Sequence, residues 1–542
     1  MIYPDRTTLG TIRQRTVLRL VCDGVERFYS DAALLLTDAT PGSTGTIDVR
    51  AGMSEPDLAD ELGQDGQGAS IEILDPGAWS DIVSGLIGAW AELSQVGEGQ
   101  DWTARRVMVR GYADAPIYGS EDEPILFGLQ ASPWTDRGLV PLPTWQVGAE
   151  TWPRSGSGLG LPEDLQGPFY PVILGDPGAD ADATTETDWY PIPALVVEID
   201  TALDPADNSA NACIVLLGAG PLGCVGGNIE LFNETTGATA ATLVPFATSD
   251  RMGQQVTCVT VAAGDMPVVA GDSLWWRPES GGLAGIAQTG TAGAAMRFLL
   301  SFSSSEVDHD LLRDVADRLD RWKVGGWINE PVSPFGWIQD NLLNILPVLS
   351  VDGPGGTAFV ALPVSPDDAA GLETIDVDEA GGSRAGPVEV SSWRDVSTSL
   401  SMEYATDTRT GAYRRRIDLD PTIDTVVGSR QPTPYGAQAS LRYAGLRLLD
   451  LTTDAICDPG TATAIAEYQI RGASQLTAEV EVVLPQTYQT LQSGDLIRLT
   501  LPDTRLPTGA PWTAALCVVL SVPRISGMGV FRFRTVPDWS RP

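Results

Sequence analysis

Glycine and proline interrupt this chain so often that short strands and turns are expected rather than long helices. The 542 residues include 58 glycines and 39 prolines, about 18% of the total. Both residue types favour turns, so the sequence predicts many short strands. Hydrophobic residues make up 43% and include 15 tryptophans, enough to form several cores despite the acidity. The length predicts three or four domains.

Charge restricts the partners of the chain. It carries 71 acidic and 34 basic residues, a net charge of −37, and Lys323 is its single lysine. Such a balance argues against binding to nucleic-acid phosphates or to anionic membranes, because such binding needs clustered positive charge. Residues 401–542 hold 14 acidic and 14 basic residues, so residues 1–400 carry the whole excess. This division predicts two surface environments, or an acidic surface that only keeps the protein soluble.

The cysteines predict free thiols in a reducing compartment, several of them in cores. None forms a Cys-x-x-Cys pair, and a single histidine leaves no zinc spacing. The polar stretch Met1–Thr8 predicts no signal peptide, and no apolar run reaches the length of a membrane span. The six are Cys22, Cys213, Cys224, Cys258, Cys457 and Cys517.

Short apolar runs bounded by turn residues predict strands in two regions. Those before residue 145 are Val17–Val21, Ala69–Leu74 and Arg106–Gly111. Those between residues 194 and 302 are Leu195–Ile199, Cys213–Leu217, Ile229–Phe232, Val256–Val261 and Ser273–Trp276. The run Ile82–Leu93 predicts a short helix instead, capped by Asp81. Leu142–Gly178, dense in Pro, Gly and Trp, predicts a long ordered loop or domain junction.

Two successive helices are predicted near the middle of the chain. Ser305 can cap the first, with Asp308 three residues later. Its apolar face holds Val307, Leu311, Val315, Leu319 and Trp322. The second begins at Ser333 and Pro334, ends before Pro347, and has an apolar side of Trp337, Ile338, Leu342, Ile345 and Leu346. The pair must bury these faces against another part of the chain.

The last third returns to β-structure after one more helix, which Asp458 and Pro459 begin and which ends near Gly472. Period-two alternation over Leu476–Leu484 predicts a strand. Further strands are predicted at Leu496–Leu501, Cys517–Val522 and Val530–Val536, completing a barrel or sandwich.

The predicted fold is mainly β with a small α portion (α+β), made of several β-barrel or β-sandwich domains and a helical pair. We expect an N-terminal β-rich domain over residues 1–145 and a Pro/Gly/Trp-rich junction over 146–192. A second β-rich domain should cover 193–303, and the helical pair 304–350, with following strands to about 375. A C-terminal β-domain should cover 376–542.

No pattern of residues predicts catalysis, a cofactor or a metal. His309, the single histidine, lies between Asp308 and Asp310, where carboxylates favour the start of a helix. Gly218, Gly220 and Gly223 match a dinucleotide fingerprint, but Pro221 interrupts it and no helical pattern follows, which predicts a turn.

Two acidic loops, one with Asp176, Asp180 and Asp182 and one with Asp376, Asp378 and Glu379, lack EF-hand spacing. We expect solvated turns there, although the sequence leaves calcium binding open. A pair of carboxylates for sugar hydrolysis also stays open, because their separation is spatial.

Four blocks in chain order resemble one family, the baseplate hub proteins at the tail tip of long-tailed phages (siphophages) and gene-transfer particles. The first comprises Arg110–Tyr112, Tyr118–Pro124 and Thr151–Pro153. The second is Phe169–Gly178, and the third joins Val307–Asp308 to Asn329–Trp337 and Asp340–Pro347. The fourth comprises Tyr435–Gly436 and Gly494–Thr500. Their order carries more weight than any single block.

The resemblance implies a structural virion protein at the tail tip, assembled in the cytoplasm of the host bacterium. Such hubs form a homotrimer that closes the tail tube and contacts the distal tail protein, the tape-measure protein and the fibre or receptor-binding protein. They line the channel through which DNA leaves without specific binding, and they do not insert into membranes. No enzymatic activity and no cofactor are expected. Some hubs carry a fused peptidoglycan hydrolase, for which this sequence shows no module.

The residues add hypotheses to this expectation. An acidic channel wall would keep DNA from adhering. Trp134, Trp145, Trp152 and Trp189 serve either as anchors for neighbouring subunits or as core residues. The alternatives are a six-fold distal tail or fibre-binding adaptor, a cell-wall polysaccharide hydrolase using carboxylates of the acidic loops, and a carbohydrate-binding protein.

Overall fold

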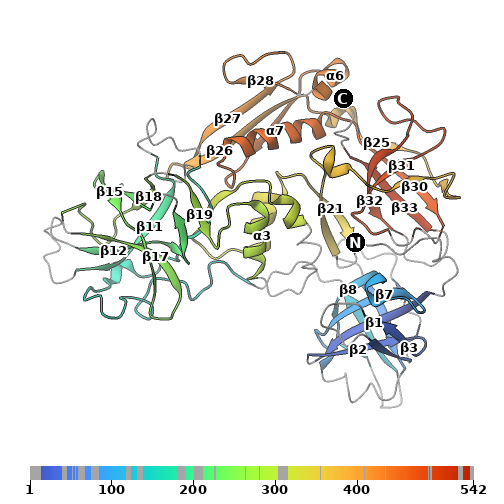
Figure 1. Cartoon of the computed structure of the whole chain (residues 1–542), viewed down its shortest axis with the longest axis horizontal. Helices are drawn as coiled ribbons and strands as arrows, with labels where there is room; N and C mark the ends of the chain where they lie inside the picture. Colours follow the sequence, from blue (N-terminus) through green and yellow to red (C-terminus); the bar gives the residue numbers. More distant parts are fainter. Residues whose placement is uncertain are drawn as a thin grey trace.

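The computed structural model (Figure 1) describes most of the chain between residues 14 and 536. The residues within these bounds that it leaves undescribed are 23, 39–45, 52, 55–56, 59–67, 75–84, 118–123, 131–137, 180–188, 201–211, 225–226, 263, 280, 303–314, 354–355, 408, 434, 486–487, 489–490 and 523–528. Within the described parts the chain folds into several sheets with few helices, which confirms the predicted class of mainly β with a small α portion. The domain bounds stay a prediction.

The N-terminal part forms a nine-stranded sheet with its own core (blue in Figure 1). In sheet order the strands are β3 (Leu34–Thr37), β4 (Thr46–Ala51), β2 (Val25–Ser30), β1 (Gln14–Cys22), β7 (Trp90–Gly97), β8 (Arg106–Ala113), β9 (Ile125–Gln130), β6 (Gly68–Ile73) and β5 (Asp57–Leu58). The three strands predicted here are present as β1, β6 and β8. A short 3-10 helix, Trp102–Ala104, precedes β8.

The helix predicted over Ile82–Leu93 is wrong where the structure describes it. Residues 86–89 form a turn, and Trp90–Gly97 is the central strand β7, paired with both β1 and β8. A short apolar run has the same pattern in a buried strand and in a buried helix, so pairing on both edges decides between them. The first part of the run, residues 82–84, lies outside the described residues.

The second β-region forms a seven-stranded sheet. In sheet order it consists of β15 (Ala238–Leu243), β14 (Ile229–Asn233), β18 (Leu274–Pro278), β11 (Ile192–Ile199), β12 (Cys213–Ala219), β17 (Gln255–Val261) and β16 (Phe246–Ser249). All its recorded pairs are antiparallel. The five strands predicted between residues 194 and 302 are β11, β12, β14, β17 and β18, and they are confirmed.

A small sheet and helices connect this region to the rest. The sheet runs β13 (Leu222–Cys224), β19 (Leu283–Ile286), β10 (Val172–Gly175) and β20 (Gly325–Ile328). The first predicted helix is present over residues 315–319, and its predicted start at Ser305 lies outside the described residues. The second begins at Ser333 as predicted, since its hydroxyl caps α5 (Pro334–Ile338), and continues as the π-helical turn η4 (Gln339–Leu343).

One helix in this middle part was not predicted. It is α3 (Ala292–Leu300), which Thr291 caps through a hydrogen bond from the amide of Ala294. It falls inside the segment for which only β-structure was expected, because the small residues at its start hide the helical pattern. A 3-10 turn, Glu163–Leu165, lies in the segment predicted as a loop.

The C-terminal part forms two sheets and two helices. One sheet runs β23 (Thr374–Asp376), β31 (Leu496–Thr500), β32 (Ala515–Ser521), β33 (Gly529–Thr535), β30 (Ala478–Leu484) and β24 (Ser383–Arg384), and β25 (Glu389–Val390) also pairs with β30. Residues between β25 and β30 form the other sheet, in the order β28 (Arg430–Pro432), β27 (Ala412–Asp420), β26 (Ser399–Asp407) and β29 (Leu448–Thr452). The helices are α6 (Tyr435–Ala444) and α7 (Pro459–Ala473), the latter capped by Asp458 as predicted.

The predicted C-terminal strands are confirmed as β30, β31, β32 and β33. A hairpin of β21 (Val348–Gly353) and β22 (Gly356–Ala361) follows the helical pair and packs on β32. Short 3-10 turns lie at Asp367–Ala369 and Trp393–Asp395. Within the described part of the chain, no helix is both long and apolar enough to span a bilayer.

Candidate functional site

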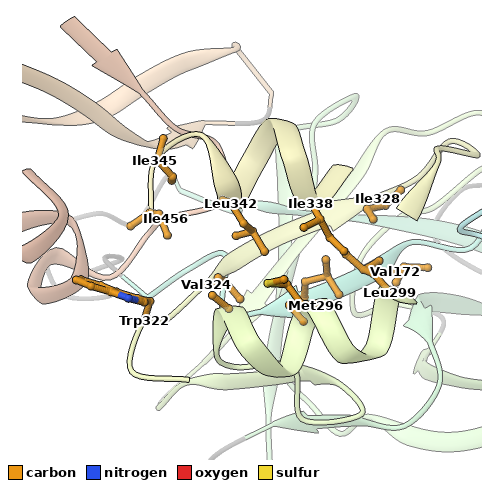
Figure 2. Packing of buried hydrophobic residues seen from close by; sticks show 14 of the residues in the cluster. Val172, Met296, Leu299, Trp322, Val324, Ile328, Ile338, Leu342, Ile345 and Ile456 are labelled. Atoms are coloured by element: carbon orange, nitrogen blue, oxygen red, sulfur yellow. The ribbon is translucent and has the colours of Figure 1, made fainter. Parts of the chain in front are cut away.

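One hydrophobic core joins parts of the chain that are far apart in sequence. Its buried members, which we call the junction core, come from the segment around residues 140–174, the second sheet, α3, the helical pair, β26, β27 and α7. Figure 2 shows Met296 and Leu299 of α3 beneath Ile338 and Leu342 of the second helix, with Ile456 to the left of Leu342. The described residues of the two predicted apolar faces therefore pack into this core, while Val307 and Leu311 lie outside the described residues. This junction is the candidate functional site.

A chain of hydrogen bonds crosses the junction core. The indole Nε1 of Trp152 donates to the hydroxyl of Tyr170 at 2.9 Å, and that hydroxyl donates to Oδ2 of Asp250 at 2.8 Å. Trp152 and Tyr170 are fully buried. Burial is the main cause that raises the pKa of Tyr170 far above its ordinary value, and the hydrogen bond to Asp250 raises it further. The phenol therefore stays protonated and keeps the loop that holds Trp152 tied to the second sheet.

Glycines allow backbones to meet at the junction. Gly175 ends β10 with φ +63°, and a Cβ there would lie 1.9 Å from the carbonyl oxygen of Val324. A Cβ on Gly325 would lie 2.2 Å from the carbonyl oxygen of Asp176, and one on Gly293 of α3 would lie 1.9 Å from that of Ala316. Larger residues at these positions would force the segments apart.

Arginine–aromatic contacts connect the β26–β27 hairpin to the second sheet. The guanidinium of Arg414 lies 5.0 Å from the ring centroid of Trp189, and that of Arg409 lies 5.5 Å from Phe232. Both arginines also lie near the buried carboxylate of Asp407, at 3.7 and 3.6 Å. These cation–π contacts fix the hairpin against Trp189, which precedes β11, and against Phe232 of β14.

Two ion pairs reinforce the junction. Nζ of Lys323, the single lysine, donates to Oδ1 of Asp458 at 2.9 Å, 135 residues further along the chain. Arg321 donates two hydrogen bonds to Asp368, of 2.9 and 2.7 Å. These bonds hold the pKa of the Asp368 carboxyl well below its usual range. The Arg321–Asp368 pair borders a cavity of about 240 Å³, and Arg318 and Trp322 also line this cavity.

The N-terminal sheet contains a buried charge cluster of its own. Glu92 of β7 is 1% exposed and accepts hydrogen bonds from Arg105 (2.5 Å) and Arg110 (2.8 Å). Burial by itself raises the pKa of this carboxyl, but the two guanidinium groups outweigh it and lower the pKa to about 2. Arg105 also lies over the ring of Trp102. The cluster is a fixed structural charge and not a proton donor at neutral pH.

Of the residues singled out for chemistry, His309, Asp180 and Asp182 lie outside the described residues. Asp176 accepts hydrogen bonds from the amides of Gly178 and Leu283. Asp376 accepts hydrogen bonds from the amides of Asp378 and Glu379, so this acidic loop is a turn. In the part of the chain that the structure describes, no three His, Cys, Asp or Glu side chains are placed to hold a metal ion.

The glycine-rich motif and the cysteines agree with the sequence prediction. The stretch from Gly218 to Gly223 joins β12 to β13, so it is a turn between strands, as expected. All six cysteines are free and five are buried. Burial raises the pKa of Cys213 and of Cys258 to about 12, which leaves these thiols protonated and unreactive at neutral pH.

Of the two roles weighed for the tryptophans, the structure supports the core role for three of them. Trp145, Trp152 and Trp189 are buried in the junction core, so they do not anchor a neighbouring subunit. Trp134 lies outside the described residues. The exposed Trp393 was not singled out in the sequence, because composition alone does not separate a surface tryptophan from a core one.

Comparisons with known proteins gave matches to solved structures at low identity. No protein-family model and no curated protein matches the chain. The chain is similar to one in the virion of a native gene transfer agent particle (13% identity, 72% of this chain and 90% of that one covered, TM-score 0.39). It is also similar to the 43 kDa tail protein of prophage MuSo2 from Shewanella oneidensis (9% identity, 97% and 99% covered, TM-score 0.30). A third match is the tail protein from Neisseria meningitidis MC58 (9% identity, 96% and 98% covered, TM-score 0.29).

Proposed function

We propose that this chain is a structural protein of a phage-type tail, and that it is the baseplate hub at the tail tip. In this role it closes the tail tube as a trimer and connects the distal tail ring, the tape-measure protein and the fibres. It acts by holding β-domains in fixed relative positions and carries out no reaction. The observation that supports this proposal is the convergence of the resembling sequence blocks on one core.

Three of the four blocks meet in the junction core. Trp152, from the first block, donates its indole hydrogen bond to Tyr170 of the second. Leu342 and Ile345, from the third block, are buried in the same core as both of these residues. Parts of three blocks thus pack into one core, whereas Arg110–Tyr112 of the first block belongs to β8 of the N-terminal sheet. A set of chance similarities would be scattered over unrelated surfaces.

The acidity of residues 1–400 fits the same role. These residues carry 57 acidic and 20 basic side chains. A channel wall with this sign of charge repels DNA phosphates, so that DNA slides past without adhering. The test is the charge of the lumen in the assembled tail, where a neutral or basic lining would contradict this part of the proposal.

The position in the particle can be tested directly. Lys323, the single lysine, has a side chain that is 65% exposed, but a chemical label on it would disturb its ion pair with Asp458. A genetic tag leaves this ion pair intact. We expect gold particles directed against a tag on this chain to label one end of intact tails, opposite the head. Labelling along the tube, or none on intact tails, would contradict the proposal. Three copies per tail support a hub, whereas six would indicate a distal tail or fibre-binding adaptor.

Enzymatic alternatives have a separate test. The isolated chain should leave a peptidoglycan zymogram without a clear band. A cleared band that persists in the purified chain would instead support a cell-wall hydrolase.

A further inference from the structure

Three arginines near the end of α6 lack carboxylate partners in a chain that has twice as many acidic as basic residues. Among the described residues, Arg394, Arg442 and Arg447 form no ion pair. Some arginines elsewhere, such as Arg297 and Arg416, each contact two carboxylates. Others, such as Arg251 and Arg505, donate to backbone carbonyl oxygens and lie singly. With so many carboxylates available, unpaired guanidinium groups gathered in one place are available to carboxylates from outside the chain.

Two of these arginines flank an exposed tryptophan. The guanidinium of Arg447 lies 4.8 Å from the ring centroid of Trp393, and that of Arg394 lies 5.8 Å from it. Arg447 is fixed there because it donates hydrogen bonds to the carbonyl oxygens of Ala444 and Arg394. Trp393 is nevertheless 49% exposed. A rigid, half-exposed tryptophan flanked by arginines has the composition of a binding hot spot.

Apolar side chains extend this surface. Tyr443 is 50% exposed, Leu446 65% and Leu448 56%. All three lie within six residues of one another and on both sides of Arg447. We name this surface the Trp393 patch, and it consists of Trp393, Arg394, Arg442, Tyr443, Leu446, Arg447 and Leu448. Asp395 and Asp450 adjoin it, so the stretch has a net charge of +1 while the chain as a whole has −37.

The patch continues into a strand edge. Strand β29 starts at Leu448 and pairs in parallel with β26 on one side. On its other side, β29 has no strand partner among the residues that the structure describes. Unpaired backbone amides and carbonyls at such an edge can pair with an added extended segment, and the side chains beside the edge then select its sequence.

We propose that the Trp393 patch and the free edge of β29 bind an extended acidic segment of another protein, with apolar residues between its carboxylates. Backbone pairing with β29 would place one face of the segment beside Leu448, and its carboxylates would reach Arg394, Arg442 and Arg447. The charge of the patch selects against basic segments. The proposal does not depend on a role in a tail, because it concerns the isolated chain.

The test uses two peptides of opposite charge, each carrying a neutral dye. One is Ac-Val-Glu-Val-Glu-Val-Glu-Val-amide, and the other has Lys in place of Glu. We expect fluorescence anisotropy to show at least tenfold tighter binding of the acidic peptide, weakening as NaCl increases. Hydrogen exchange of the amides in β29 should slow when the acidic peptide is bound. Equal binding of both peptides, or unchanged exchange in β29, would overturn the proposal.

Variants identify the surface. The double variant R394Q/R447Q should weaken binding of the acidic peptide at least tenfold, and W393A should do the same. The matched control R251Q/R505Q changes the net charge equally at two exposed arginines elsewhere and should bind like the original protein. An equal loss in the control would show that only net charge matters and would overturn the proposal.

Folding and self-association are separate readouts. W393A can unfold the patch locally. In that case peptide binding by W393F, which retains an aromatic ring, and by R394Q/R447Q tests the proposal instead. Analytical ultracentrifugation of the original protein and of R394Q/R447Q tests the other occupant, a second copy of the chain. Self-association that the double variant abolishes would overturn the proposal in favour of a contact between copies.

Discussion

The N-terminal sheet and the junction core are built in opposite ways. Buried residues of the sheet core come from one continuous part of the chain, between Leu18 and Leu129. The junction core takes its buried residues from Val140 to Ile470 and brings together segments more than 100 residues apart. A buried ion cluster around Glu92 stabilises the first, whereas close backbone approach at glycines and a neutral hydrogen-bond chain characterise the second.

This difference suggests that the N-terminal sheet and the junction core unfold separately. A core made from one continuous segment can fold and unfold without the rest of the chain. A core made from distant segments fixes the position of every element that contributes to it, so its loss releases several elements at once. We therefore expect two thermal transitions, and each change below should act on only one of them.

The largest effect is expected from Gly175→Ala. Its Cβ would meet the carbonyl of Val324 at a positive φ, so clash and backbone strain should together destabilise the junction by about 3 to 5 kcal/mol. Calorimetry should show a lower junction transition and an unchanged N-terminal one. The control Gly156→Ala has φ +79° but open space around the Cβ, and should cost about 1 to 2 kcal/mol. Equal losses for both variants would contradict the close-approach argument.

Low pH should lower the stability of the N-terminal sheet. The folded pKa of Glu92 lies at about 2, below the ordinary value of 4.5. Ionised Glu92 therefore contributes about 3 kcal/mol, fully present above pH 4.5 and lost as the pH falls from 4.5 towards 2. The N-terminal transition of Glu92→Gln should lack this part of the pH dependence. Glu72→Gln, on β6 of the same sheet, serves as the control and should retain it.

A smaller loss is expected from Tyr170→Phe. The change leaves the indole Nε1 of Trp152 and the carboxylate of Asp250 with one partner fewer in a buried site, at a cost of about 2 kcal/mol. Urea denaturation should show this loss in the junction transition. Tyr112→Phe, in β8 of the N-terminal sheet, should change stability by less than about 0.5 kcal/mol. A junction transition unaffected by Tyr170→Phe would show that the hydrogen-bond chain is dispensable.

The smallest effect concerns two neighbouring arginines of β27. Arg414→Ala removes a cation–π contact with buried Trp189 together with the pair with Asp407, and should cost about 1 kcal/mol. Arg416→Ala removes only pairs on a side chain that is 54% exposed and should cost less than Arg414→Ala, because solvent screens exposed ion pairs. The urea midpoint of the junction transition measures both. The reverse order would contradict a role for the arginine–aromatic contacts in fixing the hairpin.

Local signals predicted local structure well. Ser333 with Pro334, and Asp458 with Pro459, mark helix starts because a capping side chain and a proline act within one turn. The alternation of apolar and polar residues predicted β30 because this pattern, too, acts between residues close in sequence. The apolar run that ends at Leu93 was wrongly predicted to be a helix. It forms a central strand because β1 and β8 pair with it on either side. Helix α3 was missed because its start consists of small residues, whose helical state depends on packing.

The sequence by itself determined the class of fold, the free cysteines, and the acidity of residues 1–400, since these follow from composition and from short-range patterns. Only the tertiary structure decided that Trp145, Trp152 and Trp189 are core residues and that Trp393 is exposed. It also decided that Tyr170 joins Trp152 to Asp250, and that Arg394 and Arg447 remain without carboxylates. The physical reason is that burial and pairing depend on segments distant in sequence, which no local pattern records.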